Sequence, residues 1–186
     1  MFAGHFAVGL ALKSRYRNVP TWALLFATQL CDGLWIILSW LDKEHFRLFF
    51  TPSGVLRLDL YDAAYSHSLF WSAFYALVVF LLFVRAEGQR HWAVPLSLAV
   101  FSHWFLDWLI VAPSLPFANF GPAVKFGAGL GEIFPLADLL LEAVIVLAGW
   151  RVYDRSISSA RSRTRWGILA VLIVALLSPR LLQRLL

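Results

Sequence analysis

The sequence holds a single cysteine, Cys31, among 186 residues. One cysteine excludes an intrachain disulfide and a structural zinc site built from thiolates, because both need at least two. Charged residues are also scarce, at 15% of the chain, whereas hydrophobic residues make up 60%. A soluble domain of this length cannot hide so much apolar surface, because roughly half of its residues face water. The composition therefore predicts an integral membrane protein with a single domain, residues 1–186.

Acidic residues are few, 11 against 16 Lys and Arg, which gives a net charge of +5. The basic residues gather at the ends of hydrophobic segments and form no patch interleaved with aromatic residues. The charge therefore indicates contact with anionic headgroups of membrane lipids, and no nucleic-acid partner is predicted. The first apolar stretch, residues 2–12, has no basic residue before it, which is not typical of a cleavable signal peptide. The sequence leaves the oligomeric state open.

Hydrophobic segments alternate with short connectors along the chain. We expect an all-α integral membrane bundle of five transmembrane helices, preceded by a half-length helix at residues 2–12, with a metal site inside the bundle. The longest connector, residues 42–66, is expected to be polar with a turn at residues 51–54, and residues 113–131 read as a loop rich in glycine and proline. The five predicted spans are residues 21–41, 67–85, 92–111, 134–150 and 166–177.

The distribution of basic residues predicts the orientation. The connectors on one side, residues 13–20, 85–91 and 151–165, hold ten Lys and Arg, and the other side holds six. The positive-inside rule places the more basic side in the cytoplasm. The expected location is a bacterial cytoplasmic membrane, with the 42–66 connector and the 113–131 loop on the outside.

Costly polar side chains interrupt the apolar segments. A carboxylate near the middle of a membrane helix costs roughly 3 kcal/mol on insertion scales, and such residues usually mark function. His103 and Asp107 are four residues apart and share one helix face, as do Asp138 and Glu142. The depths estimated along the predicted spans favour a site that opens outward. The candidate metal ligands are His5, Asp32, His67, His103, Asp107, Asp138 and Glu142.

Oxygen and imidazole ligands suit zinc, and also manganese or iron. A catalytic metal lowers the pKa of its bound water to about 7, and two or more metals can clamp both reacting oxygens of a phosphoester. The candidate catalytic carboxylates are Asp32, Asp107 and Glu142, one of which would take the proton from water. Hydrogen-bonded Asp–His pairs without a metal are the alternative. Five other polar residues are expected to be solvated, namely Glu44, His45, Asp59, Asp62 and His91.

Five short motifs occur in order along the chain: Gly4-His5-Phe6-Ala7-Val8-Gly9, Gln29-Leu30-Cys31-Asp32, Tyr65-Ser66-His67-Ser68-Leu69, Ser102-His103-Trp104-Phe105-Leu106-Asp107 and Leu139-Leu140-Leu141-Glu142. In combination they resemble the YdjM-like family of membrane-bound proteins assigned as metal-dependent hydrolases. The resemblance implies a family-like bundle over residues 1–153, followed by a basic loop and a final helix in residues 154–186. That family is distantly similar to the superfamily of zinc-dependent phospholipase C and single-strand nucleases, which binds three zinc ions.

The resemblance also implies roles for individual residues. The ligands of the first metals would be His5, Asp32, His67, His103 and Asp107, with Asp107 bridging two ions. Glu142 and Asp138 would serve a second metal. Two departures stand out: Asp62 replaces a histidine of the closest subgroup, and Val111-Ala112-Pro113-Ser114 replaces its His-Arg-Pro-Asp. One metal position and a substrate-anchoring arginine are thus missing from the pattern.

The expected function is a membrane-embedded, zinc-dependent hydrolase of a phosphoester bond in a lipid or amphiphilic substrate, with Lys125 of the 113–131 loop covering a headgroup. Ion or proton transport is a second hypothesis, because Asp and His chains inside membranes also carry ions. The inverted repeat that many carriers show is not visible in this sequence. A third hypothesis is a metal-retaining scaffold that has lost catalysis.

Overall fold

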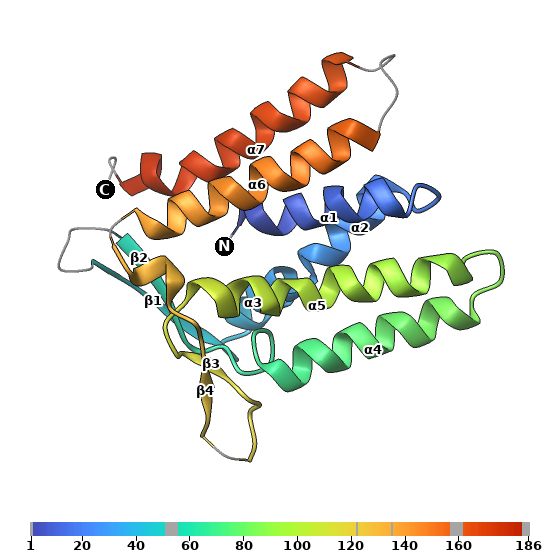
Figure 1. Ribbon diagram of the computed structural model, residues 1–186. Helices are drawn as coiled ribbons and strands as arrows, with labels where there is room; N and C mark the ends of the chain where they lie inside the picture. The colour runs from blue at the N-terminus through green and yellow to red at the C-terminus, as the bar shows by residue number, and fades with distance from the viewer. Residues whose placement is uncertain (1, 51–55, 122, 135, 157–161, 184–186) are drawn as a thin grey trace.

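The computed structural model describes residues 2–50, 56–121, 123–134, 136–156 and 162–183 (Figure 1). Helices dominate these residues: α1 (Ala3–Arg15), α2 (Thr21–Thr28), α3 (Leu30–Trp40), α4 (Leu69–Arg85), α5 (Ala93–Ile110), α6 (Ala137–Ser156) and α7 (Ser162–Gln183). Two antiparallel hairpins join them, β1 (His45–Phe50) with β2 (Leu56–Asp62) and β3 (Leu115–Pro116) with β4 (Lys125–Phe126). Two short 3₁₀ turns complete the described elements, η1 (Arg90–Trp92) and η2 (Leu130–Glu132).

Helix α5 lies at the centre of the helix packing. It packs against α4, α2 and α1, and α1 in turn packs against α6 and α7. Figure 1 shows α7, α6, α1 and α5 as successive, roughly parallel rods, with α4 beside α5 and the β1–β2 hairpin at one end. One core cluster lies between α1, α6 and α7, and a second lies between α2 and α5. Between these two clusters, α1 and α5 pack side by side. The residues at their contact therefore form a buried layer.

The prediction of five transmembrane helices is wrong. Among the described residues, only one continuous segment, Arg90–Ile110, is by itself long and apolar enough to cross a membrane. It consists of η1 and α5, with 21 residues and a mean hydropathy of 1.4. The bent pair α2 and α3 adds a second candidate if it forms one broken span. More than half of the α5 window, 56%, is buried inside the protein, as in the core helix of a soluble domain. One or two such helices are weak support for a membrane bundle.

The other predicted spans fail for local reasons. Helix α4 is limited to 17 residues, because Ser68 caps its first turn and places His67 outside the helix. Helix α6 carries Asp138 and Glu142 near its start and basic residues near its end. The apolar part of α7 is confined to Trp166–Leu177, which is too short to cross a bilayer.

The segment 21–41, predicted as one span, is broken at Gln29. The backbone N–H of Gln29 bonds the carbonyl of Phe26, and the axes of α2 and α3 differ by 50°. The break makes Asp32 a first-turn residue of α3, where the helix dipole favours a carboxylate. It also leaves Thr28 as the last residue of α2, where carbonyls lack intrahelical partners.

The expectation of an all-α chain is also wrong, because both long connectors form hairpins. Residues 42–66 hold β1 and β2, whose aromatic and aliphatic side chains favour strands. Arg47 faces Asp59 across this hairpin, with Nε 2.8 Å from the carboxylate oxygen. Residues 113–131 hold β3 and β4. The turn predicted at residues 51–54 lies outside the described residues.

The basic segment 151–165, predicted as a loop, is helical at both of its described ends. Helix α6 continues to Ser156, and α7 begins at Ser162. Residues 157–161 between them lie outside the described residues. The C-terminal region is therefore a helix pair, in which α7 covers α6 and reaches α1.

Gly149 of α6 allows the close approach of α1, and it provides a test of this packing. A Cβ added at Gly149 would lie 2.4 Å from the carbonyl oxygen of Ala7 in α1. We expect Gly149→Ala to lower the free energy of unfolding by about 1–3 kcal/mol, because the helices must move apart. Gly167→Ala in α7 is the matched control, since no atom lies within 4 Å of its added Cβ. Losing a helical glycine there should stabilise the protein by about 0.5–1 kcal/mol. Thermal or denaturant unfolding that shows the same shift for both variants would contradict the packing.

Candidate metal centre

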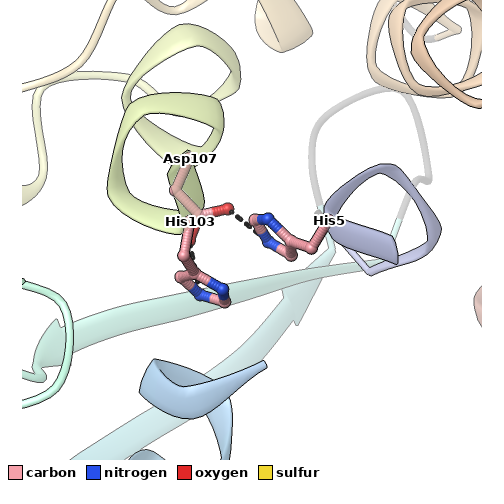
Figure 2. Close-up of side chains that lie close together, drawn as sticks. All are labelled: His5, His103 and Asp107. Carbon is pink, nitrogen blue, oxygen red and sulfur yellow. Dashed lines mark ion pairs between the residues drawn. The ribbon is translucent and has the colours of Figure 1, made fainter. Parts of the chain in front are cut away.

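Five of the seven predicted ligands meet at the centre of the helix packing. We call His5, Asp32, His67, His103 and Asp107 the His–Asp cluster. His5 comes from α1, Asp32 from α3, His67 from the turn before α4, and His103 and Asp107 from α5. Figure 2 shows the side chains of His5, His103 and Asp107 pointing toward one another. The ligand atoms form two overlapping groups, His5–His103–Asp107 and Asp32–His67–His103, each within 4.8 Å. These groups can hold a metal ion.

Nitrogen and oxygen atoms alternate around the centre of the cluster. Oδ1 of Asp32 lies 3.4 Å from Nε2 of His67 and 3.5 Å from Nε2 of His103. Oδ2 of Asp107 lies 3.3 Å from Nε2 of His103 and 3.9 Å from Nε2 of His67. Each imidazole nitrogen therefore faces one oxygen from each of the two carboxylates.

These distances fit ligands of a shared cation better than direct hydrogen bonds. A charge-assisted bond between imidazolium and carboxylate is about 2.7–2.9 Å long. Two ligands bound tetrahedrally to one zinc ion, each at about 2.1 Å, lie about 3.4 Å apart. The spacing between His67, His103, Asp32 and Asp107 is close to the second value. Asp32, His67 and His103 form one group whose ligand atoms all lie within 4.8 Å of one another, and zinc accepts such a set of two imidazoles and a carboxylate.

Asp107 faces both groups of the cluster. Its Oδ2 approaches His103 and His67, whereas its Oδ1 lies 3.3 Å from Nε2 of His5. The side chain is buried, and α5 places it one turn after His103 on the same face. A carboxylate with its two oxygens directed to opposite sides has the geometry of a bridging ligand.

The ring of His103 is oriented by the backbone. Its Nδ1 lies 2.8 Å from the carbonyl oxygen of Thr28, at the end of α2. A carbonyl only accepts hydrogen bonds, so Nδ1 is the donor, and in the neutral ring Nε2 keeps its lone pair. Nε2 is buried and has no hydrogen-bond partner among the described residues. Despite the burial of the ring, Asp107 and Asp32 raise the pKa of His103 well above 6.5, so in the metal-free protein Nε2 carries a proton that a metal ion would displace.

His5 is fully buried and lies beside His103. The residue is 0% exposed, and neither ring nitrogen has a hydrogen-bond partner among the described residues. Its ring stacks on that of His103, with centroids 3.8 Å apart. Burial, reinforced by His103, lowers the pKa of His5 to about 4. The imidazole is therefore neutral at pH 7 and offers a lone pair to a cation.

Asp32 marks the accessible side of the cluster. The other four residues are buried, whereas the Asp32 side chain is 26% exposed. Trp35, one turn further along α3, stands edge-on against His67, with ring centroids 6.4 Å apart. Asp32 is therefore the member of the cluster that solvent reaches.

Two predicted ligands lie outside the cluster. Oε1 of Glu142 accepts a hydrogen bond of 3.0 Å from the backbone N–H of Gly4, so α6 caps the first turn of α1 next to His5. Asp138 lies beside η2, where its Cβ would be 3.3 Å from a Cβ on Gly131. Neither residue belongs to the two groups that can hold a metal. Their shared helix face does not bring them to the centre.

Glu44 was expected to be solvated, and this prediction is wrong. Glu44 is 2% exposed. Its Oε1 accepts hydrogen bonds from the backbone N–H groups of Tyr65 and Ser66, at 2.7 and 2.9 Å, and its Oε2 accepts one from the Ser66 hydroxyl at 2.5 Å. No local pattern reveals this role, because the partners lie 21 and 22 positions away in the sequence.

Asp62, which stands where the YdjM-like resemblance implies a histidine, lies outside the cluster. Asp62 instead pairs with His45, whose Nδ1 lies 2.8 Å from its carboxylate and whose Nε2 lies 3.2 Å from Asp42. Hydrogen bonding to Asp62 raises the pKa of the exposed His45. This triad ties the end of α3 to the end of β2.

No protein-family model, curated protein or solved structure matches this chain. The resemblance to the YdjM-like family stays a prediction, and the His–Asp cluster stands on its own geometry.

Metal content tests the cluster directly. We expect protein purified with zinc to retain at least one equivalent per chain, and His103→Ala or Asp107→Ala to retain less than half an equivalent, because each removes a ligand that faces the centre. His91→Ala is the matched control, since His91 is exposed, lies outside the His–Asp cluster and contacts Trp92 through its ring. Elemental analysis measures the content. Less than half an equivalent in the unmodified chain, unchanged in the variants, would contradict a metal centre.

The burial of His5 predicts a pH dependence of the metal-free protein. The pKa of His5 is about 4 in the folded chain and 6.5 in the unfolded chain. The unfolded state therefore binds more protons between these values, and the free energy of unfolding falls as pH drops from 6.5 to 4, by about 3 kcal/mol from this group. His5→Gln should flatten the dependence in that window. Denaturant unfolding with chelator measures it, and identical slopes for both proteins would show that His5 is not buried as a neutral ring.

Proposed function

We propose that this protein is a metal-dependent hydrolase that cleaves a phosphoester bond in a lipid or amphiphilic substrate. The observation that carries the proposal is the spacing of Asp32 Oδ1 from Nε2 of His67 and of His103, which suits one cation shared by these three residues. Zinc accepts this mixture of ligands best, and manganese and iron accept it too. A site with one partly exposed ligand also leaves room for a water or a substrate oxygen, as catalytic metal sites require.

The residues of the cluster would divide the chemistry between them. A metal held here would supply a water with a pKa of about 7 and would polarise a phosphoryl oxygen. Asp32 is the best candidate for the general base, because it is the accessible carboxylate and approaches the imidazoles through Oδ1, which leaves Oδ2 for a proton. The buried Asp107 would hold the centre in place and keep water out of the layer behind it.

A second ion would bind on the other side of Asp107. Nε2 of His5 and Oδ1 of Asp107 lie 3.3 Å apart. Glu142 accepts a hydrogen bond from the backbone N–H of Gly4, the residue before His5. We assign Glu142 to this second position as the neighbouring carboxylate. Two ions that share Asp107 could clamp the attacking and leaving oxygens of a phosphoester.

The exterior supports a lipid environment and a lipid-like substrate. Large apolar side chains are exposed on α2 and α3, including Phe26 at 75% and Trp40 at 84%. The β1–β2 hairpin exposes Leu48 and Phe50 beside the exposed Arg47. Large exposed apolar side chains favour contact with lipid. We therefore propose location at a membrane with membrane lipids as partners; the bacterial cytoplasmic membrane and an opening toward the outside follow from the distribution of Lys and Arg in the sequence alone.

Turnover of phosphoesters tests the proposal. We expect zinc-loaded protein to hydrolyse a phospholipid or a generic phosphodiester, and a chelator to abolish the reaction. Asp32→Asn and Asp107→Asn should lower kcat by about 100-fold or more, because each removes a charged group from the centre. His91→Ala should leave the rate unchanged. Full zinc binding without turnover of any phosphoester would contradict the hydrolase and favour a metal-retaining scaffold.

The same assay separates two roles of Glu142. In Glu142→Gln the amide oxygen can still accept the Gly4 N–H, so the contact between α6 and α1 is kept while the charge is lost. Reduced turnover with an unchanged melting temperature would support a role at the second ion. Unchanged turnover would show that Glu142 only caps α1.

A further inference from the structure

We infer that Glu44 positions His67 for metal binding, by fixing the proton of its ring on Nδ1 through the hydroxyl of Ser66. The inference rests on the proposed metal centre and adds a residue to it that contacts neither metal nor substrate. Glu44 is thus a positioning residue, and its action is on the tautomer of one ligand.

Glu44 is held in a single orientation. It lies between α3 and β1, is 2% exposed, and accepts three hydrogen bonds from residues 65 and 66. A buried carboxylate without such donors would be strongly unfavourable. The three donors compensate for its burial and leave it no freedom to turn, so its Oε2 stays against the Ser66 hydroxyl.

The direction of the hydrogen bonds follows from counting protons. A carboxylate carries no proton, so the single hydrogen of the Ser66 hydroxyl is donated to Glu44. The Ser66 oxygen is also 2.7 Å from Nδ1 of His67, and with its own hydrogen already used it can only accept there. Nδ1 therefore carries the ring proton of His67. Its Nε2 keeps a lone pair, 3.4 Å from Oδ1 of Asp32.

His103 gives an independent comparison within the same cluster. Its Nδ1 donates to the carbonyl of Thr28, so Nε2 is the nitrogen that faces the carboxylates. Both rings thus turn Nε2 toward the carboxylates, and in each the proton of Nδ1 is held by a hydrogen-bond acceptor, the Thr28 carbonyl or the Ser66 hydroxyl. Partners of this kind, which set the tautomer of a ligating histidine, are typical of metal sites.

Replacing Glu44 by glutamine would reverse the chain of hydrogen bonds. The amide oxygen can accept the two backbone N–H groups, which turns the amide NH₂ toward Ser66. Ser66 would then accept from Gln at this position and donate its own hydrogen to Nδ1 of His67. The ring proton would move to Nε2, where it blocks metal binding. The size of the side chain and the number of hydrogen bonds stay the same, so only the direction changes.

Zinc affinity and the tautomer of His67 test this inference together. We expect Glu44→Gln to weaken zinc binding by about 10–100-fold in a competition titration with a chelating dye. Glu132→Gln is the matched control, because Glu132 also accepts a backbone N–H, from Ala112, and is exposed. It should change the affinity less than twofold.

The ¹⁵N signals of the His67 ring report its tautomer directly. They are recorded in metal-free protein at pH 8 and are identified with the His67→Gln variant. We expect the ring proton on Nδ1 in the natural chain and on Nε2 in Glu44→Gln. Ser66→Ala is the second variant, since it removes the hydroxyl that links Glu44 to His67 but keeps both hydrogen bonds from the backbone to Glu44. We expect a mixture of His67 tautomers and a smaller loss of zinc affinity.

Unchanged zinc affinity and an unchanged His67 tautomer in these variants would overturn the inference while leaving the metal centre intact. A natural chain that binds no zinc would instead overturn the proposed function, and the ¹⁵N signals would still report on Glu44.

Discussion

The structure depends on a cluster of imidazole nitrogens and carboxylate oxygens that positive charge stabilises. Nε2 of His67 and of His103 faces carboxylate oxygens of Asp32 and Asp107 at 3.3–3.9 Å. The other nitrogen of each ring is hydrogen-bonded away from the centre, to Ser66 or Thr28. Despite its burial, His103 has a pKa that Asp107 and Asp32 raise well above 6.5, so a proton on this ring supplies positive charge in the metal-free protein. A metal ion can replace that proton, and it fits the spacing, which is too long for direct ion-pair hydrogen bonds.

The irregular parts of the fold are the parts that assemble this centre. The break at Gln29 places Asp32 in the first turn of α3 and leaves the Thr28 carbonyl at the end of α2 for His103. The Ser68 cap keeps His67 outside α4, and the chain entering the β1–β2 hairpin carries Glu44 to Ser66. The contact of α1 with α6 at Gly149 fixes the helix that carries His5. Each of these features shortens or bends a segment that a simple membrane span would have kept straight.

The sequence predicted the residues of the centre better than the fold around them. The four-residue spacing of His103 and Asp107 on one apolar helix was sufficient to place them together. The same spacing in Asp138 and Glu142 did not place them in the cluster, because periodicity states which residues share a face and not which face meets the centre. Hydrophobic content alone suggested five spans, whereas capping, bends and charges limit the helices that form. Glu44 was predicted to be solvated, because the partners that bury this carboxylate lie 21 and 22 positions away in the sequence.

Anomalous diffraction from crystals of the zinc-loaded protein tests the central claim most directly. The account predicts a peak at the zinc absorption edge about 2.0–2.2 Å from Nε2 of His67 and His103 and from Oδ1 of Asp32. An empty centre in which these atoms close to direct hydrogen bonds of about 2.7–2.9 Å, or zinc bound only at other residues, would contradict it.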